Sequence, residues 1–190
     1  VRRILPSARS VIVTATLYNT DRPYSTASVD SGEAIVSRYA WGEDYHGVLE
    51  RRLEALLAWM RAQHDAPFEA RPYVDTGPIQ ERVHARHAGL GWIGKNTCLI
   101  HPDLGSWVFL SEIVCSLDLE PDEPGLDRCG SCTRCLDACP TGALVAPRVL
   151  DATRCVSYLT IELKGPLPGS HRDAIGRHVF GCDICQDVCP

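Results

Sequence analysis

Cysteine is the residue that most constrains what this chain can fold into. Ten of its 190 residues are cysteines, and eight of the ten follow residue 128. Disulfides, zinc sites, iron–sulfur clusters and redox thiols all use cysteines in such numbers. Disulfides distributed along the chain are disfavoured, because the cysteines gather in one part of it and no secretory leader is visible. No apolar run reaches the length of a membrane span, so we expect no membrane partner and a cytoplasmic location.

The spacing of the eight late cysteines favours two 4Fe–4S clusters. The first four follow the pattern C-x2-C-x2-C-x3-C-P, which is the run found in bacterial ferredoxins. The fourth cysteine of such a run binds the neighbouring cluster, so a second group must supply the exchanged ligand. We expect one cluster to be held by Cys129, Cys132, Cys135 and Cys189. We expect the other to be held by Cys139, Cys155, Cys182 and Cys185.

The other uses of cysteine fit this pattern less well. Zinc sites are built from paired ligands separated by a dozen or more residues, which the run from 129 to 139 does not resemble. Disulfides between cysteines on neighbouring helical positions have poor geometry. The two early cysteines, Cys98 and Cys115, lie in apolar strand patterns, so we expect both to be small buried core residues.

Residues 1–117 predict a mixed α/β domain. Its apolar periodicities and breakers predict a strand at 10–18, a helix at 45–64, a strand at 69–75 and a helix at 78–88. Residues 97–100 and 107–114 are predicted to pair as a hairpin around a turn-rich loop.

An acidic, proline-containing stretch follows at residues 118–127 and indicates a linker. It holds five carboxylates and so accounts for the whole formal charge of −5. The rest of the chain is neutral, and its acidity is therefore a weak argument against a nucleic-acid partner. We place the domain boundary near residue 118, which makes residues 118–190 the cluster domain.

Three stretches of the first domain are candidates for chemistry. YVDTGP places Asp75 between a predicted strand and a helix start, where an aspartate is more often a cap than a catalytic acid. GLGWIGKN at 89–96 is glycine-rich but is a weak nucleotide motif. RYAWGEDYH at 38–46 concentrates aromatic and charged groups. Its His46 could ligate a metal, but we expect it to be structural.

These strings resemble, in the same order, the cobalamin-dependent iron–sulfur tRNA epoxyqueuosine reductases. The resemblance covers nearly the whole chain and rests on RYAWGEDYH, YVDTGP, GLGWIGKN, GSWVFLSEI, CGSCTRCLDACPTGAL, RCVSYLTIELKG and FGCDICQDVCP. It implies an α+β fold, with a nitroreductase-like α/β cobalamin-binding domain at 1–117 and a bacterial dicluster ferredoxin-like domain at 118–190. Against that family the chain is expected to be an excerpt, truncated at its N-terminus and without the C-terminal helical repeats.

The resemblance also implies an activity and a set of site residues. The family reduces epoxyqueuosine to queuosine at the wobble position of tRNA, with cobalamin fed by two 4Fe–4S clusters. By motif, Asp75 becomes the proton donor and Lys164 a tRNA contact. The implied cobalamin contacts are Arg38, Asp75, Leu99, Leu110, Ile113, Ser157, Cys182 and Asp183. The implied partners are tRNA carrying epoxyqueuosine and an unidentified electron donor, and the implied state is a monomer.

Two other functions stay open from the sequence. One is reductive dehalogenation by a relative with the same cofactors, although those enzymes use a tyrosine acid where this chain offers Asp75. The other is a plain electron-transfer ferredoxin joined to an inert α/β domain, which predicts about eight irons and no cobalt.

Overall fold

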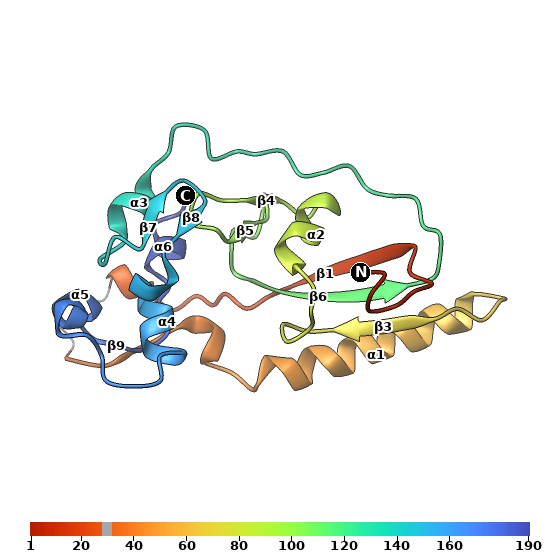
Figure 1. Ribbon diagram of the computed structural model, residues 1–190, viewed down its shortest axis with the longest axis horizontal. Coiled ribbons are helices and arrows are strands. Elements are labelled where there is room, and N and C mark those ends of the chain that lie inside the picture. The colour runs from red at the N-terminus through yellow and green to blue at the C-terminus, as the bar shows by residue number, and fades with distance from the viewer. Residues whose placement is uncertain (28–31) are drawn as a thin grey trace.

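The computed structural model describes residues 1–27 and 32–190, and its central feature is a three-stranded antiparallel sheet (Figure 1). The strands are β1 (Ser10–Leu17), β6 (Val108–Cys115) and β3 (Ala70–Tyr73), in the order β1-β6-β3. Strand β6 lies in the middle, with Ile113 opposite Ile12 on one side and Pro72 on the other. Its residues from Ser111 to Cys115 are all buried, because both edges are paired and both faces are covered.

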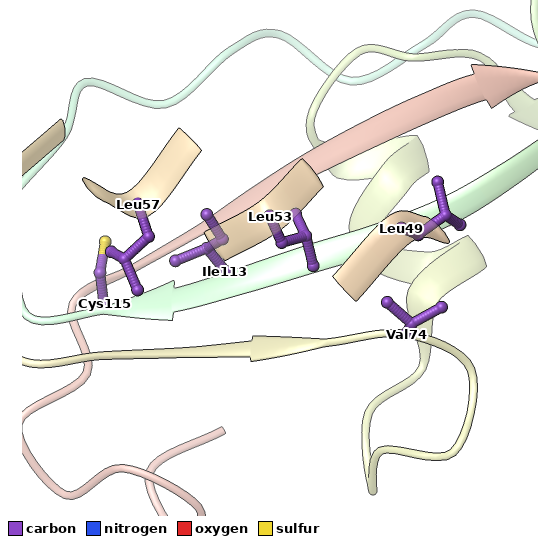
Figure 2. Close-up of a cluster of buried hydrophobic side chains, with 6 residues drawn as sticks. All are labelled: Leu49, Leu53, Leu57, Val74, Ile113 and Cys115. Atoms are coloured by element: carbon purple, nitrogen blue, oxygen red, sulfur yellow. The ribbon is translucent and has the colours of Figure 1, made fainter. Parts of the chain in front are cut away.

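Helix α1 (Tyr45–Gln63) covers one face of this sheet. The Asp44 side chain caps its first turn by accepting a hydrogen bond from the His46 amide. Its apolar positions recur at helical spacing, as predicted, and so form one buried stripe. That stripe packs against the sheet in the core cluster of Figure 2: Leu49, Leu53, Leu57, Val74, Ile113 and Cys115. The prediction that Cys115 is a core residue is confirmed.

The opposite face is covered by the N-terminal segment and by α2 (Glu81–His87). Val114 packs there against Leu5 and Ala8. The predicted helix at 78–88 was too long at its start, because Asp75 adopts a left-handed φ of 53° and the following residues form a turn. This turn carries Asp75 out of the sheet and toward solvent.

The predicted hairpin between 97–100 and 107–114 is wrong. Strand β5 (Leu99–Ile100) pairs instead with β4 (Trp92–Ile93), and β6 pairs with β1 and β3. The reason is a tight turn before β5, in which Gly94 N–H donates to the Cys98 carbonyl and Thr97 has a φ of 70°. An isolated bridge between His101 and Gly105 lies in the loop that the prediction placed between the two strands.

The other elements gather beyond the end of the sheet (Figure 1). They are β2 (Ile35–Val36), α3 (Arg134–Ala138), β7 (Leu144–Ala146), β8 (Val149–Leu150), α4 (Val156–Ile161), α5 (Arg172–Ile175), β9 (His178–Phe180) and α6 (Ile184–Asp187). Short 3-10 turns lie at Ser25–Ala27, Arg38–Ala40, Ala152–Arg154 and Gly169–His171. Strand β2 pairs in parallel with β9, so an early segment of the chain joins the late cysteine region.

Residues 118–127 form neither helix nor strand and run along the molecule from β6 toward α3 (Figure 1). The segment is held along its length, since Arg9 pairs with Asp118 and the Gly125 amide donates to the Arg86 carbonyl. Within the described residues, no helix is long and apolar enough to cross a membrane.

Candidate functional site

Four of the late cysteines line one cavity of about 180 Å3, called here the outer cavity: Cys129, Cys132, Cys135 and Cys189. Trp92 Nε1 donates to the Cys129 sulfur at 3.4 Å. The Lys95 ammonium donates to the Gly130 and Cys132 carbonyls at 2.7 and 2.8 Å. These contacts hold the cysteine loop against β4 and place one positive charge beside it.

The other four line a second cavity of about 200 Å3, called here the inner cavity: Cys139, Cys155, Cys182 and Cys185. The Ala143 amide donates to the Cys139 sulfur at 3.3 Å. Burial raises the pKa of Cys182 to about 12. A thiolate at Cys182 therefore needs a strong local positive charge, which bound iron supplies.

The two cavities thus gather the two ligand sets expected from the sequence, with Cys139 and Cys189 exchanged between them. No three His, Cys, Asp or Glu side chains in the described residues converge closely enough for one metal ion. A four-iron cluster does not need such convergence, because each thiolate binds a different iron atom.

Asp75 forms a separate polar site at the end of β3. Its Oδ2 accepts a hydrogen bond from the Tyr45 hydroxyl at 2.7 Å, and His46 Nε2 lies 3.4 Å from the same oxygen. Its backbone amide donates to Glu81 Oε1 at 2.8 Å, which fixes the left-handed turn to the start of α2. The Asp75 side chain is 58% exposed, so this carboxyl is accessible from solvent.

The pKa values of the groups around Asp75 are shifted by burial and by their mutual contacts. Burial and then the hydrogen bond to Asp75 raise the pKa of Tyr45, so its hydroxyl keeps its proton. The hydrogen bond to Asp44 and, more weakly, the contact with Asp75 raise the pKa of His46. Burial raises the pKa of Glu81 as well. Of these groups, the Tyr45 hydroxyl is the one that donates to the Asp75 carboxyl.

Asp75 also lines a cavity of about 390 Å3, called here the acid cavity. Leu99 and Leu110 line the same cavity, and Val108 and Phe109 add to its apolar floor. A larger groove of about 650 Å3 adjoins it and shares with it Asp75, Glu81 and Arg82. The acid cavity and the inner cavity share Cys98 and Gln186, so they lie on two sides of one wall.

Of the other residues named from the sequence, Ser157 and Cys182 line the inner cavity. Ile113 lies in the core under α1 and does not line the acid cavity. Lys164 is exposed just after α4.

Arg38 and Asp183 lie together and are buried. The Asp183 carboxylate accepts hydrogen bonds from the Ser37 hydroxyl and, at 2.7 Å, from the Arg38 amide. The Arg38 guanidinium donates to Asn19, Thr20, Arg22 and Pro23. Arg38 therefore supports the loop of residues 19–23, and it does not line the acid cavity.

Sequence reasoning missed three residues of these sites. Tyr45 was noted only as part of RYAWGEDYH, and His46 was expected to be structural, yet both contact Asp75. Cys98 was expected in an apolar strand. It lies instead in the wall of the inner cavity, which Cys185 also lines. Strand periodicity alone could not distinguish this position from a core cysteine.

Comparison with known families defines the class of protein first. Residues 128–190 match the "4Fe-4S double cluster binding domain" family, so this is an iron–sulfur protein of the two-cluster kind. Residues 1–76 match the family described as "Epoxyqueuosine reductase QueG, DUF1730". The chain is 51% identical, over all of its length, to an epoxyqueuosine reductase of Synechocystis sp., of which it covers 65%.

Solved structures agree with the sequence comparison. The whole chain superposes with a TM-score of 0.89 at 44% identity on an epoxyqueuosine reductase bound to an epoxyqueuosine-modified tRNA-Tyr stem loop. It superposes with a TM-score of 0.88 at 42% identity on the Bacillus subtilis enzyme, whose catalytic aspartate loop is swung out of the active site. The chain belongs to the epoxyqueuosine reductase family, and it spans half the length of each of these solved chains.

Proposed function

We propose that this chain carries the reductive centre of an epoxyqueuosine reductase, which converts epoxyqueuosine in tRNA to queuosine. The observation that carries the proposal is the position of Asp75 in the acid cavity, one wall away from the inner cluster cavity. The relative whose structure contains a modified tRNA stem loop supports the choice of substrate. Reduction of the epoxide to a carbon–carbon double bond consumes two electrons and two protons and releases water.

The acid cavity fits the cobalamin that such a reaction uses. Leu99, Leu110 and Phe109 give it an apolar floor, and the adjoining groove leaves it open for a large flat group. When bound, cobalamin supplies a cobalt centre that collects two electrons and delivers them to carbon. We accordingly propose that residues 1–117 are a cobalamin-binding domain of the nitroreductase-like kind.

Asp75 acts in this proposal as the general acid that protonates the departing epoxide oxygen. Tyr45 and His46 hold its Oδ2 from one side, which leaves Oδ1 for the substrate. The Glu81 contact with the Asp75 amide keeps the carboxyl at the mouth of the cavity. The Tyr45 hydroxyl donates to this carboxyl, so it stabilises the carboxylate that remains after proton transfer.

The clusters lie in an order that suits single-electron delivery. Asn96 lines both cluster cavities, and Cys98 and Gln186 separate the inner cavity from the acid cavity. Electrons from a donor, whose identity the proposal leaves open, would enter at the outer cluster and leave from the inner one.

For the RNA we propose contact through Lys164, which is exposed on the cluster side of the molecule. Loaded clusters add about two negative charges each, so a phosphate backbone needs local basic groups of this kind. A monomer acting in the cytoplasm completes the proposal.

The test uses anaerobically reconstituted protein. The unmodified protein should hold about eight irons, bind cobalamin and convert epoxyqueuosine in tRNA. Asp75→Asn should retain iron and cobalamin but lose turnover, whereas the exposed Asp65→Asn should match the unmodified protein. Unchanged turnover of Asp75→Asn would remove Asp75 from the mechanism. Eight irons with no cobalamin binding would instead favour a plain ferredoxin.

A further inference from the structure

The outer cavity is lined by positive side chains, and the inner cavity is not. Lys95, Arg128 and Arg134 line the outer cavity, and no Asp or Glu among the described residues lines it with them. The residues that line the inner cavity include no Lys, Arg, His, Asp or Glu. Positive charge is therefore concentrated at one of the two cluster cavities, in a chain whose formal charge is −5.

Two of these three cations are available to a partner. The Lys95 ammonium is already engaged by carbonyls of the cysteine loop. Arg128 and Arg134 are exposed, and neither forms an ion pair within the part of the chain that the structure describes. Asp127, the acid next to Arg128, is paired with Arg148 instead. The charge that faces solvent at the outer cavity is accordingly that of the two arginines.

The arginines lie close to the ligands of the outer cavity. The Arg128 guanidinium lies over the ring of Trp92, 6.0 Å from its centroid, and Trp92 Nε1 donates to the Cys129 sulfur at 3.4 Å. Leu126, two residues before Arg128, is 79% exposed, which is the largest value for an apolar side chain of its size in the described residues. Arg128, Arg134 and Leu126 are called here the docking surface.

The place of the docking surface separates it from the site of reduction. The acid cavity shares Cys98 and Gln186 with the inner cavity, but it shares no lining residue with the outer cavity. A base that reacts beside Asp75 is therefore separated from the docking surface by both cluster cavities. An electron donor has the opposite requirement, because it must come close to the first cluster of the chain. This position favours a donor over RNA as the occupant.

We propose that the docking surface receives an acidic one-electron carrier protein, which reduces the outer cluster. Electron-transfer partners use small, transient interfaces, and opposite charges increase their rate of association. In each encounter the carrier loses one electron and the outer cluster gains it, so two encounters supply the two electrons of one reduction. The inference rests on the proposed function for the cluster and for its need of a donor, and goes beyond it in placing and describing that donor.

The experiment measures how fast a carrier reduces the anaerobically reconstituted protein. The probe is the hydroquinone of an acidic flavodoxin, whose one-electron oxidation to the semiquinone is followed by stopped-flow absorbance. Its second-order rate constant should fall as salt is added to the unmodified protein. In the double variant Arg128→Gln/Arg134→Gln the rate constant at low salt should be about tenfold lower and should depend less on salt.

Two variants serve as controls. Arg128→Lys/Arg134→Lys keeps both charges and should stay close to the unmodified protein. Arg52→Gln removes an exposed arginine of α1 that lines neither cluster cavity, and it should also leave the rate unchanged. Iron analysis of every variant shows whether the clusters are assembled.

A second reductant distinguishes docking from a change in the cluster itself. Reduced methyl viologen is a small cation that needs no docking surface, so its rate should not fall in the glutamine double variant. A fall with both reductants would mean a changed cluster and would overturn the inference. A flavodoxin rate that does not respond to salt or to the arginines would overturn it as well.

The remaining outcomes separate this inference from the proposed function. Weaker binding of a tRNA stem loop to the glutamine double variant, with an unchanged flavodoxin rate, would assign the surface to RNA and overturn the inference. Unmodified protein that viologen reduces but that leaves epoxyqueuosine in tRNA unconverted would refute the proposed function alone. Unmodified protein that assembles no outer cluster would refute both.

Discussion

Glu112 is a carboxylic acid in the centre of the sheet, and its ionisation should destabilise the fold. The side chain is completely buried on the face of β6 that α2 covers. Its Oε1 lies 2.9 Å from His84 Nδ1, while its Oε2 has no hydrogen-bond partner among the residues that the structure describes. Burial raises the pKa of Glu112 from 4.5 to about 7. The folded protein therefore prefers the protonated form of this group.

The size of the effect follows from that difference in pKa. Below pH 4.5 the carboxyl is protonated in both the folded and the unfolded chain, and its titration contributes nothing. As the pH rises from 4.5 to about 7, the unfolded chain ionises first and stability falls. At about 1.36 kcal/mol per pH unit, the full loss above pH 7 is about 3 kcal/mol. The glutamine of Glu112→Gln cannot ionise, so this variant should not show that loss of stability.

The assay is anaerobic urea unfolding of reconstituted protein near pH 5 and near pH 8. Between these pH values the unmodified protein should lose about 2.5 kcal/mol more than Glu112→Gln does, since part of the loss already lies below pH 5. Because each protein is compared with itself at two pH values, the pH-independent effect of replacing the carboxyl by an amide on stability cancels. Glu50→Gln, on the exposed side of α1, should show the same pH dependence as the unmodified protein. Equal pH dependence in Glu112→Gln and the unmodified protein would refute the reasoning.

Three further changes test other parts of the structure. Asp183→Ala leaves a buried hydroxyl and a buried amide without an acceptor, so urea unfolding should show a loss of at least about 2 kcal/mol. Gly91→Ala places a Cβ 2.0 Å from the Ile100 carbonyl oxygen and should sharply reduce the yield of folded protein, whereas Gly42→Ala, with open space around it, should not. Cys189→Ser should remove the outer cluster and keep the inner one, which iron analysis and paramagnetic resonance would show; loss of the inner cluster alone would contradict the exchange.

What the sequence could predict depended on whether the signal was local. The α1 stripe follows from one helical period, and the double-cluster domain follows from cysteine spacing, which depends on the size of a cluster. The pairing of β5 could not be predicted in this way. The left-handed backbone of Thr97 forms a turn that brings β5 back against the preceding strand, β4. The position of Cys98 was equally hidden, since the inner cavity that it lines is built from segments far apart in the chain.

The site around Asp75 shows the same limit. YVDTGP indicated an acid at a strand end, and the structure brings Tyr45 and His46 to it from the start of α1. Packing of α1 across the sheet creates that contact, and no periodicity within either segment encodes it. Arg38 was expected at a cofactor, and that stays a prediction; the structure adds that its guanidinium donates to the loop of residues 19–23, which no local pattern indicated.

The exchange of Cys139 and Cys189 between the two cavities has a consequence for how this protein is made. The ribosome extends the chain in one direction, and the first cysteine run emerges long before the second. Three cysteines of the outer cavity and one of the inner cavity are then present, and neither set of four is complete. On the proposed ligand sets, either cluster can be completed only on a chain that has emerged past both runs. A fragment that ends between the two cysteine runs would carry two incomplete sets of ligands rather than one complete set.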